Sequence, residues 1–230
     1  MNDAEYKIVP LTPLRKIIAA RMTEAKQTIP HYRISMDIEV DALLALRKQI
    51  NADQPDKKVS LNDFIIKACA SALLEYPEIN AQFVDNEIHQ YPQADISVVI
   101  AVDGGLSTPV IRKANTKTVW EIAAEIKDLA TRANSGQLKM DEILGGSFSI
   151  SNLGMYGVDQ FDAIINPPQC AMLAIGCAKP QAVVKAGALT TAAIMWLSLS
   201  LDHRAIDGLT GAQFLSVLRE RLGKPGCLLA

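Results

Sequence analysis

The regular alternation of apolar and polar residues is clearest at residues 31–40, which read HYRISMDIEV. Every second side chain from Tyr32 to Val40 is apolar, and the side chains between them are charged or hydroxylated. Because successive side chains of a strand point to opposite faces, the pattern predicts a strand with one buried face. Further strands are predicted at 94–102 and 107–112, which flank the turn DGG, and at 147–151, 170–177 and 192–201.

Other segments carry apolar residues at helical spacing. In LTPLRKIIAARMTEAKQT, Thr12 is a suitable N-cap and Pro13 suits the first turn. The predicted apolar stripe of this helix consists of Leu14, Ile17, Ile18, Met22 and Ala25.

Four more helices are predicted from their end signals. One starts at Asp41, and the next is framed by Ser60 and Asp63. The third has a capping box of Thr118 and Glu121, with Gly136 near its end. The last helix is predicted over about 208–222.

Strands and long helices are mixed without strict βαβ alternation, which predicts an α/β (α+β) fold with a mixed sheet flanked by helices. The chain has 230 residues with no Pro/Gly/Ser-rich linker and no repeat of fixed period. We therefore expect one domain over residues 1–230.

Charge, apolar stretches and cysteine spacing exclude several classes of protein. The formal net charge is −2, and no local basic patch is evident, so neither nucleic acid nor an anionic membrane is an expected partner. The longest apolar stretches, such as AAIMWLSLSL, are too short to span a membrane, and the polar start lacks a secretory signal. The four cysteines contain no C-x-x-C pair, which is typical of buried thiols in a reducing, intracellular compartment.

The sequence LSLDHRAIDG is the first candidate for chemistry, because His203 follows an apolar strand and Asp207 lies four residues later. An imidazole with a pKa near ~6.5 can take a proton from a thiol with a pKa near ~8.5. Asp207 would then hold the local backbone, and Gly208 would allow a sharp turn. Alternatively, His203 closes a strand and Asp207 caps the last helix. The residues alone leave both interpretations open.

The second candidate is GGSFSISNLGMYG, in which Ser147, Ser149 and Ser151 share one strand face. A hydroxyl there could stabilise an oxyanion, but this segment alone favours an ordinary serine-rich strand end. There is no dinucleotide or Walker phosphate loop and no H-E-x-x-H cluster, so no NAD, ATP or metal is expected. His31 and His89 lie in contexts typical of structural or surface residues.

Together these segments resemble the catalytic domain of the dihydrolipoamide acyltransferases, the core components of 2-oxo acid dehydrogenase complexes. The resemblance covers nearly the whole chain in the same order. It rests on VPLTPLRKIIAARM, IPHYRISMDIEV, SLNDFIIKACASAL, ISVVIAVDGGLSTPVI, SFSISNLGMYGVDQFDAIINPPQCAMLAIG and LSLSLDHRAIDGLTGAQFL.

The resemblance implies a chloramphenicol-acetyltransferase-like fold that forms trimers, with the active site in a channel between subunits. By motif position, His203 matches the general base that deprotonates the coenzyme A thiol. Ser151 matches the hydroxyl that binds the tetrahedral oxyanion, and Asp207 matches the motif carboxylate, a structural support rather than a proton carrier. Coenzyme A is then a substrate, the lipoyl group comes on a separate domain, and no metal is required.

The resemblance also implies partners. These are a lipoyl domain and the decarboxylase and dihydrolipoamide dehydrogenase components of the complex, in the cytoplasm or the mitochondrial matrix. The sequence contains no lipoyl or peripheral-subunit-binding domain, so we expect it to be the catalytic part of a longer chain. The terminal GKPGCLLA resembles the short apolar end by which family trimers meet in large cores.

Two alternative functions can be distinguished by features of the sequence. An inactive core or binding subunit of the same fold would be expected to lack the motif histidine or the strand serine, and this chain has both. A free-standing acetyltransferase for a small alcohol or amine fits ISNLGMYG and INPPQCAMLAIG less well than the lipoyl enzymes do. Acetyl, from pyruvate or acetoin, is the acyl group that the resemblance favours over succinyl and branched-chain groups.

Overall fold

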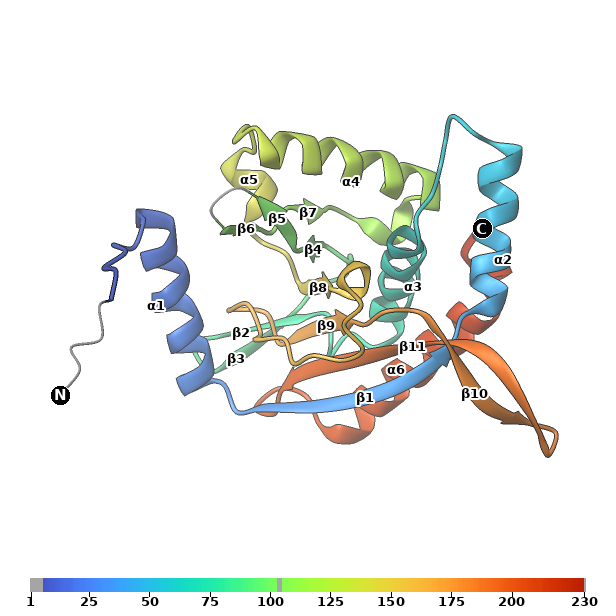
Figure 1. Ribbon diagram of the computed structural model, residues 1–230. Helices are drawn as coiled ribbons and strands as arrows, with labels where there is room; N and C mark the ends of the chain where they lie inside the picture. Colours follow the sequence, from blue (N-terminus) through green and yellow to red (C-terminus); the bar gives the residue numbers. More distant parts are fainter. Residues whose placement is uncertain (1–5, 103–104, 230) are drawn as a thin grey trace.

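The computed structural model describes residues 6–102 and 105–229 and contains a central sheet with helices packed against it (Figure 1). The helices are α1 (Pro13–Thr28), α2 (Asp41–Asp53), α3 (Leu61–Glu75), α4 (Val119–Asn134), α5 (Met140–Ile143) and α6 (Gly208–Gly223). The strands are β1 (His31–Glu39), β2 (Ala81–Val84), β3 (Glu87–Gln90), β4 (Ile96–Val98), β5 (Ile100–Val102), β6 (Gly105–Ser107), β7 (Val110–Ile111), β8 (Phe148–Asn152), β9 (Ala171–Ile175), β10 (Lys179–Lys185) and β11 (Ala188–Asp202). Short 3₁₀ turns occur at Ala114–Thr116, Gly154–Tyr156 and Pro225–Leu229.

The main sheet is mixed, as the sequence predicted. Its strand order is β1-β11-β9-β8-β4-β7, and β10 pairs with the first half of β11. Strands β4, β8 and β9 are parallel to one another, whereas β1, β10 and β9 are each antiparallel to β11. The long strand β11 therefore pairs with three other strands, β1, β9 and β10.

One face of the sheet is apolar and carries the helices. On β11, Leu197, Leu199 and Leu201 are fully buried in the main core. Helices α3 and α6 pack on this face, where the Phe214 ring of α6 lies 5.8 Å from the Phe148 ring of β8. Burial of this face supplies the main driving force for folding.

The opposite face carries small and hydroxylated residues. Ser198 of β11 is buried there, and its hydroxyl lies 3.0 Å from the hydroxyl of Ser35 on β1. An irregular segment around Phe161 and Ala163 covers Met172 and Ala174 of β9 on this side. The two faces therefore differ in chemistry as well as in what packs against them.

The predicted helix ends are confirmed. The Thr12 hydroxyl accepts a hydrogen bond from the Arg15 N–H, and capping boxes form at Ser60/Asp63 and at Thr118/Glu121. Gly136, just past α4, adopts a positive φ of 67°. Local side-chain chemistry is thus enough to define where these helices begin.

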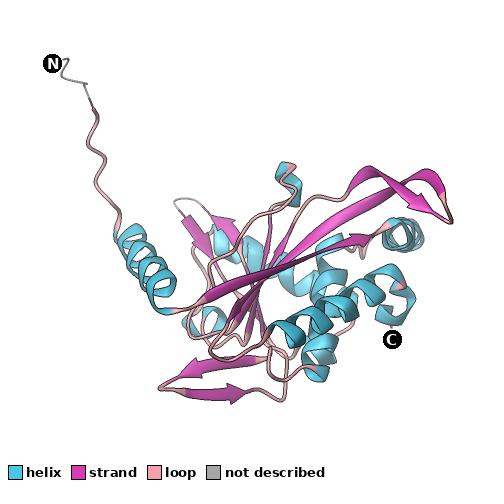
Figure 2. Cartoon of the chain, turned by 90° about the horizontal axis from the view of Figure 1, so that it is seen from below, coloured by secondary structure: helices cyan, strands magenta, loops and turns pink. Residues whose placement is uncertain are grey.

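The apolar stripe of α1 does not pack as a core face within this chain. Only Ala25 of the stripe is buried, and Leu14 and Ile17 are exposed. Figure 2 shows α1 and the extended segment before it projecting away from the sheet. That segment adds four exposed apolar side chains, which are Tyr6, Ile8, Val9 and Leu11.

Several short strands were not predicted. Strands β2 and β3 form a hairpin whose turn residues Asp85 and Asn86 both have positive φ. Strand β10 forms a second hairpin with β11 through Ala186 and Gly187. Positive φ at both central residues is typical of a type I′ hairpin turn. The dipeptides Asp85-Asn86 and Ala186-Gly187 were therefore the sequence signals for these two hairpins.

The predicted strand at 94–102 is divided in two. Val99 interrupts it, because its N–H donates to the Ile150 carbonyl of β8 while β5 leaves to pair with β6. The predicted DGG turn lies mostly outside the described residues, since Asp103 and Gly104 belong to the gap. Within the described ranges, no helix is long and apolar enough to cross a membrane.

We predict that Gly211→Ala destabilises the protein. A Cβ at Gly211 would lie 2.4 Å from Leu201 Cδ1 and 2.9 Å from Ile34 Cδ1, so either these packed side chains or α6 would have to shift. Such overpacking costs about 1–3 kcal/mol. Gly223→Ala is the matched control at the other end of α6, where a Cβ meets no atom within 4 Å. Thermal unfolding at equal protein concentration should show a lower midpoint only for Gly211→Ala, and equal midpoints would contradict the prediction.

Candidate functional site

The turn after β11 presents His203 at the end of the sheet. Its backbone N–H donates to the Pro30 carbonyl at 3.2 Å, and its side chain is exposed. The imidazole centroid lies 4.4 Å from that of the Tyr32 ring, with the two planes inclined by 41°. One face of the imidazole therefore rests on a tyrosine of β1.

Tyr32 connects this turn to the sheet. Its hydroxyl donates to the Ile206 carbonyl at 3.3 Å, and burial, followed by the charge of Asp207, raises its pKa to about 12. The phenol therefore keeps its proton at neutral pH. The sequence indicated only that Tyr32 lies on the apolar face of β1, because its contact with His203 arises from the pairing of β1 with β11.

Asp207 is the N-cap of α6. Its carboxylate accepts a hydrogen bond from the Thr210 N–H at 2.8 Å. This bond is the main reason why the pKa of Asp207 is lowered, and the charge of His203 contributes least. Between the described residues, no hydrogen bond joins the Asp207 carboxylate to the His203 ring. The structure therefore gives Asp207 the capping position that the sequence suggested as one of two alternatives.

Ser147, just before β8, and Ser149 and Ser151 within it alternate along the chain, as predicted, but they differ in their partners. The Ser147 hydroxyl donates to Asn80 Oδ1 at 2.5 Å, and the Ser149 hydroxyl donates to Gln169 Oε1. Ser151 is 8% exposed, and its hydroxyl has no hydrogen-bond partner among residues 6–102 and 105–229. Ser151 is thus the serine of the row whose hydroxyl is available to a ligand.

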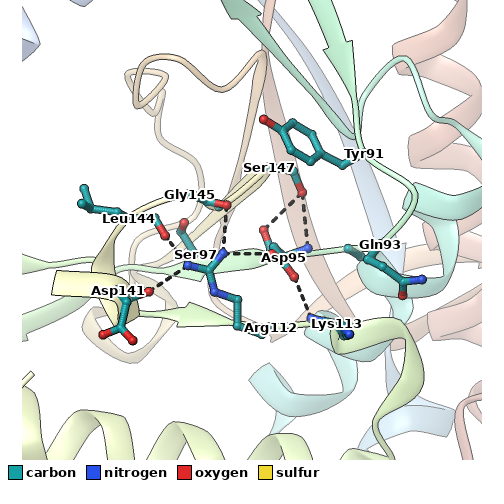
Figure 3. A network of polar contacts seen from close by, with 12 residues as sticks. Tyr91, Gln93, Asp95, Ser97, Arg112, Lys113, Asp141, Leu144, Gly145 and Ser147 are labelled. Carbon is teal, nitrogen blue, oxygen red and sulfur yellow. Dashed lines mark hydrogen bonds and ion pairs between the residues drawn. The ribbon is translucent and has the colours of Figure 1, made fainter. Parts of the chain in front are cut away.

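A polar network anchors the start of β8 (Figure 3). Arg112 pairs with Asp95 at 2.9 Å and donates to the carbonyls of Asp141, Leu144 and Gly145. The Asp95 N–H in turn donates to the Ser147 hydroxyl at 3.3 Å. The sequence contains no signal for this network, because its members come from three separate segments, at residues 95, 112 and 141–147.

The turn after Ser151 is held by close backbone packing. Asn152 Oδ1 accepts the Gly154 N–H at 2.9 Å, forming a local turn. A Cβ on Gly154 would lie 2.6 Å from the Gly176 carbonyl oxygen, so only glycine fits at this approach. The next two residues, Met155 and Tyr156, are exposed. The end of β8 is therefore fixed by backbone packing, and the two side chains that follow it expose apolar surface.

The structure does not bring Ser151 and His203 together within one chain. Ser151 is in register with Ala174 of β9, and Ala174 is in register with Ser198 of β11. Because β8 and β11 run in opposite directions, Asp202 lies four residues beyond Ser198, away from Ser151. At about 3.4 Å per residue and 4.8 Å per strand spacing, the Cα atoms of Ser151 and Asp202 are roughly 17 Å apart.

The other two histidines have structural and surface roles, as the sequence indicated. His31 Nε2 accepts the Ile165 N–H at 3.0 Å, so the neutral ring carries its proton on Nδ1 and donates to the Ile29 carbonyl at 2.9 Å. His89 is exposed beside Glu87. Within residues 6–102 and 105–229, no group of three or more His, Cys, Asp or Glu side chains is placed to hold a metal ion.

Surface hollows of about 430 and 330 Å³ lie elsewhere on the described chain. The first is lined by residues of α2 and α6, including Arg219 and Glu220, and the second by residues near Arg112. Neither is lined by His203 or Ser151. His203 is exposed at the surface of this chain, whereas Ser151 is buried.

Comparison with known proteins gives a consistent family. The model of the 2-oxoacid dehydrogenases acyltransferase (catalytic domain) family matches residues 3–230. The dihydrolipoyllysine-residue acetyltransferase component of the pyruvate dehydrogenase complex of Rickettsia bellii is 44% identical over 231 residues, covering 99% of this chain and 55% of that protein. The chain thus spans about half the length of the curated relatives that it matches.

Solved structures agree. The dihydrolipoamide acetyltransferase of Azotobacter vinelandii is 30% identical, with a TM-score of 0.94 over 98% of this chain and 95% of that one. The cubic core of the pyruvate dehydrogenase multienzyme complex is also 30% identical, with a TM-score of 0.94 over 99% and 96%. A chloramphenicol acetyltransferase at 15% identity, with a TM-score of 0.51 over 92% and 94%, shares the fold.

We predict that Asp207 can be replaced by asparagine but not by alanine. Asparagine keeps the cap, whereas Asp207→Ala should lower the unfolding midpoint by about 2–4 °C. Because the folded-state pKa of Asp207 is lowered, its charge stabilises the protein above the ordinary carboxyl pKa of 3.8 and loses this effect as the pH falls through the folded-state value. Any advantage of the wild type over Asp207→Asn in thermal melts should therefore shrink below about pH 4. An Asp207→Asn protein as unstable as Asp207→Ala at pH 7 would contradict the capping role.

Proposed function

The chain belongs to the 2-oxoacid dehydrogenase acyltransferase family, as its sequence resemblance predicted, and from this premise we propose that it transfers an acetyl group between dihydrolipoamide and coenzyme A. We also propose that it forms part of the structural core of a 2-oxo acid dehydrogenase complex. The structure at TM-score 0.94 that is described as a cubic core supports this second role.

In this reaction His203 acts as the general base. Its imidazole takes the proton of the coenzyme A thiol, and the thiolate attacks the thioester carbonyl of acetyl-dihydrolipoamide. The Ser151 hydroxyl donates a hydrogen bond to the oxyanion that forms. When the carbon–sulfur bond to dihydrolipoamide breaks, the leaving thiolate takes back the proton from the imidazolium. Thiol replaces thiol, so positioning, one base and one oxyanion donor are sufficient.

The opposite directions of β8 and β11 carry the proposal that the site lies between two copies of the chain. With the Cα atoms of Ser151 and Asp202 roughly 17 Å apart by strand geometry, the Ser151 hydroxyl and the His203 ring of one chain do not contact each other, which favours a site completed by a second chain. In a homotrimer, His203 of one subunit can face Ser151 of the next. The threefold symmetry then repeats this pairing at all three interfaces and closes the assembly. The exposed apolar residues of α1 and the preceding segment are suited to packing against such a neighbour.

The Azotobacter vinelandii structure supports the choice of residues. It comes from an investigation of a serine, a histidine and an asparagine in the catalytic mechanism of that enzyme. The serine and histidine are separated along that chain by the same number of positions as Ser151 and His203, and the asparagine follows its histidine at the same distance as Asp207 follows His203. An asparagine at this position is consistent with Asp207 acting as a support, since an amide cannot serve as a proton carrier.

Substrate and partners follow from the same relatives. The curated matches are acetyltransferase components of pyruvate dehydrogenase complexes, which favours acetyl and a lipoyl domain as carrier. We propose the decarboxylase and dihydrolipoamide dehydrogenase of the complex as further partners. Since one relative is mitochondrial and the others are bacterial, we place the protein in the cytoplasm or the mitochondrial matrix. Catalytic efficiencies with a panel of acyl-CoA donors and dihydrolipoamide would rank acetyl first under this proposal.

The two alternatives have direct tests. A non-enzymatic core subunit would show no turnover with acetyl-CoA and dihydrolipoamide. A free-standing acetyltransferase for small alcohols or amines would prefer chloramphenicol to dihydrolipoamide as acceptor.

We predict that His203→Ala lowers turnover about 10²–10⁴-fold while assembly is unchanged. Ser151→Ala should lower turnover roughly 10²-fold or more with little change in coenzyme A affinity, because its hydrogen bond strengthens in the transition state. Steady-state kinetics on variants of native mass would measure both. Normal turnover of His203→Ala would exclude it as the base, and a Ser151→Ala defect confined to coenzyme A binding would make Ser151 a binding residue.

A mixing experiment tests the shared site. Neither His203→Ala nor Ser151→Ala subunits alone can form an intact site, but mixed trimers contain interfaces that combine both wild-type residues. Co-refolding the two variants should therefore restore part of the wild-type turnover. Mixed trimers of confirmed mass that recover no activity would place both residues of a site in one subunit.

A further inference from the structure

The residues on either side of His203 in the sequence form an ion pair with each other. Arg204 donates through Nε to Asp202 Oδ1 at 3.0 Å and through Nη2 to Asp202 Oδ2 at 2.6 Å. The Arg204 backbone N–H also donates to Asp202 Oδ1 at 3.0 Å. This pair closes a ring across the backbone of His203, which restricts the torsion angles of the residue between them.

Asp202 is in turn fixed to the body of the protein. Its side chain is 1% exposed, and its N–H donates to the Cys170 carbonyl of β9 at 2.9 Å. Its own carbonyl accepts the N–H groups of Ala205 at 3.1 Å and Ile206 at 3.0 Å. Every polar group of Asp202 is therefore bonded, and the turn that carries His203 begins from a rigid point.

The other side of Arg204 is held by the β2–β3 hairpin. The guanidinium carbon lies 4.1 Å from the centroid of the Phe83 ring, within the range of a cation–π contact. Phe83 is fixed by its own N–H, which donates to the Pro168 carbonyl at 2.8 Å. The planar guanidinium is thus clamped between a carboxylate and an aromatic ring, an arrangement that lysine cannot reproduce.

We propose that Asp202, Arg204 and Phe83 are positioning residues that fix the direction in which the His203 imidazole faces the substrate thiol. An ion pair between a buried carboxylate and a partly exposed arginine adds little net stability, so we assign its value here to geometry. A displacement of about 1 Å in a reacting group can cost about 10²-fold in rate. The inference rests on the proposed acetyl transfer with His203 as base.

The test compares Arg204→Lys in the wild-type and His203→Ala backgrounds. With acetyl-dihydrolipoamide as donor, Arg204→Lys should lower kcat about 10–100-fold in the wild type and leave the KM for coenzyme A within about twofold. In the His203→Ala background it should lower kcat no further, since there is no imidazole to position. Arg132→Lys is the matched control, because Arg132 forms a similar two-bond pair with Glu142 on α4 and α5, with both distances 2.7 Å, and should keep kcat within about twofold.

Three results would overturn the inference. These are an unchanged kcat for Arg204→Lys, an equal loss in both backgrounds, and an equal loss in Arg132→Lys. If Arg204→Lys does not assemble to native mass, Phe83→Leu decides the question. It should lower kcat about 3–10-fold in the wild type alone, and an unchanged kcat would count against the proposal. Failure of the proposed function is recognised separately, by an inactive wild type or a fully active His203→Ala protein.

Discussion

The opposite directions of β8 and β11 are the constraint on which the rest of this structure depends. Parallel β8 and β9 followed by antiparallel β11 make the C-terminal ends of β8 and β11 point to opposite ends of one sheet. This separation is set by backbone pairing, and it underlies our proposal that the site is shared between two copies of the chain. The exposed apolar side chains before and within α1 are consistent with that proposal.

The two faces of the sheet differ in chemistry. The leucine face of β11 lies in the main core with α3 and α6 and provides stability, while the opposite face carries the serines. Strands β8 and β11 are both anchored at one end by an arginine and a carboxylate, Arg112 with Asp95 at the start of β8 and Arg204 with Asp202 at the end of β11. Such pairs contribute direction more than net stability.

Local sequence chemistry was sufficient for most elements. The N-caps and capping boxes of α1, α3 and α4 are visible in the sequence, because each depends on residues within one helical turn. The alternation in β1 likewise survives unchanged over nine residue pairs with β11. The strands that escaped prediction are short or exposed, such as β2, β3 and β10, where few buried side chains mark a period of two and only the turn residues signal a hairpin.

The sequence by itself thus determined the family, the fold class, the helix ends and the three residues Ser151, His203 and Asp207 as candidates. Only the tertiary structure decided which hydroxyls are already bonded, that Tyr32 supports His203, and that Arg204 is clamped between Asp202 and Phe83. It also decided that Ser151 and His203 follow strands whose C-terminal ends point to opposite ends of the sheet. The reason is physical, since caps and strand periodicity involve neighbours in sequence, whereas these contacts depend on strand register and direction, which join residues far apart along the chain.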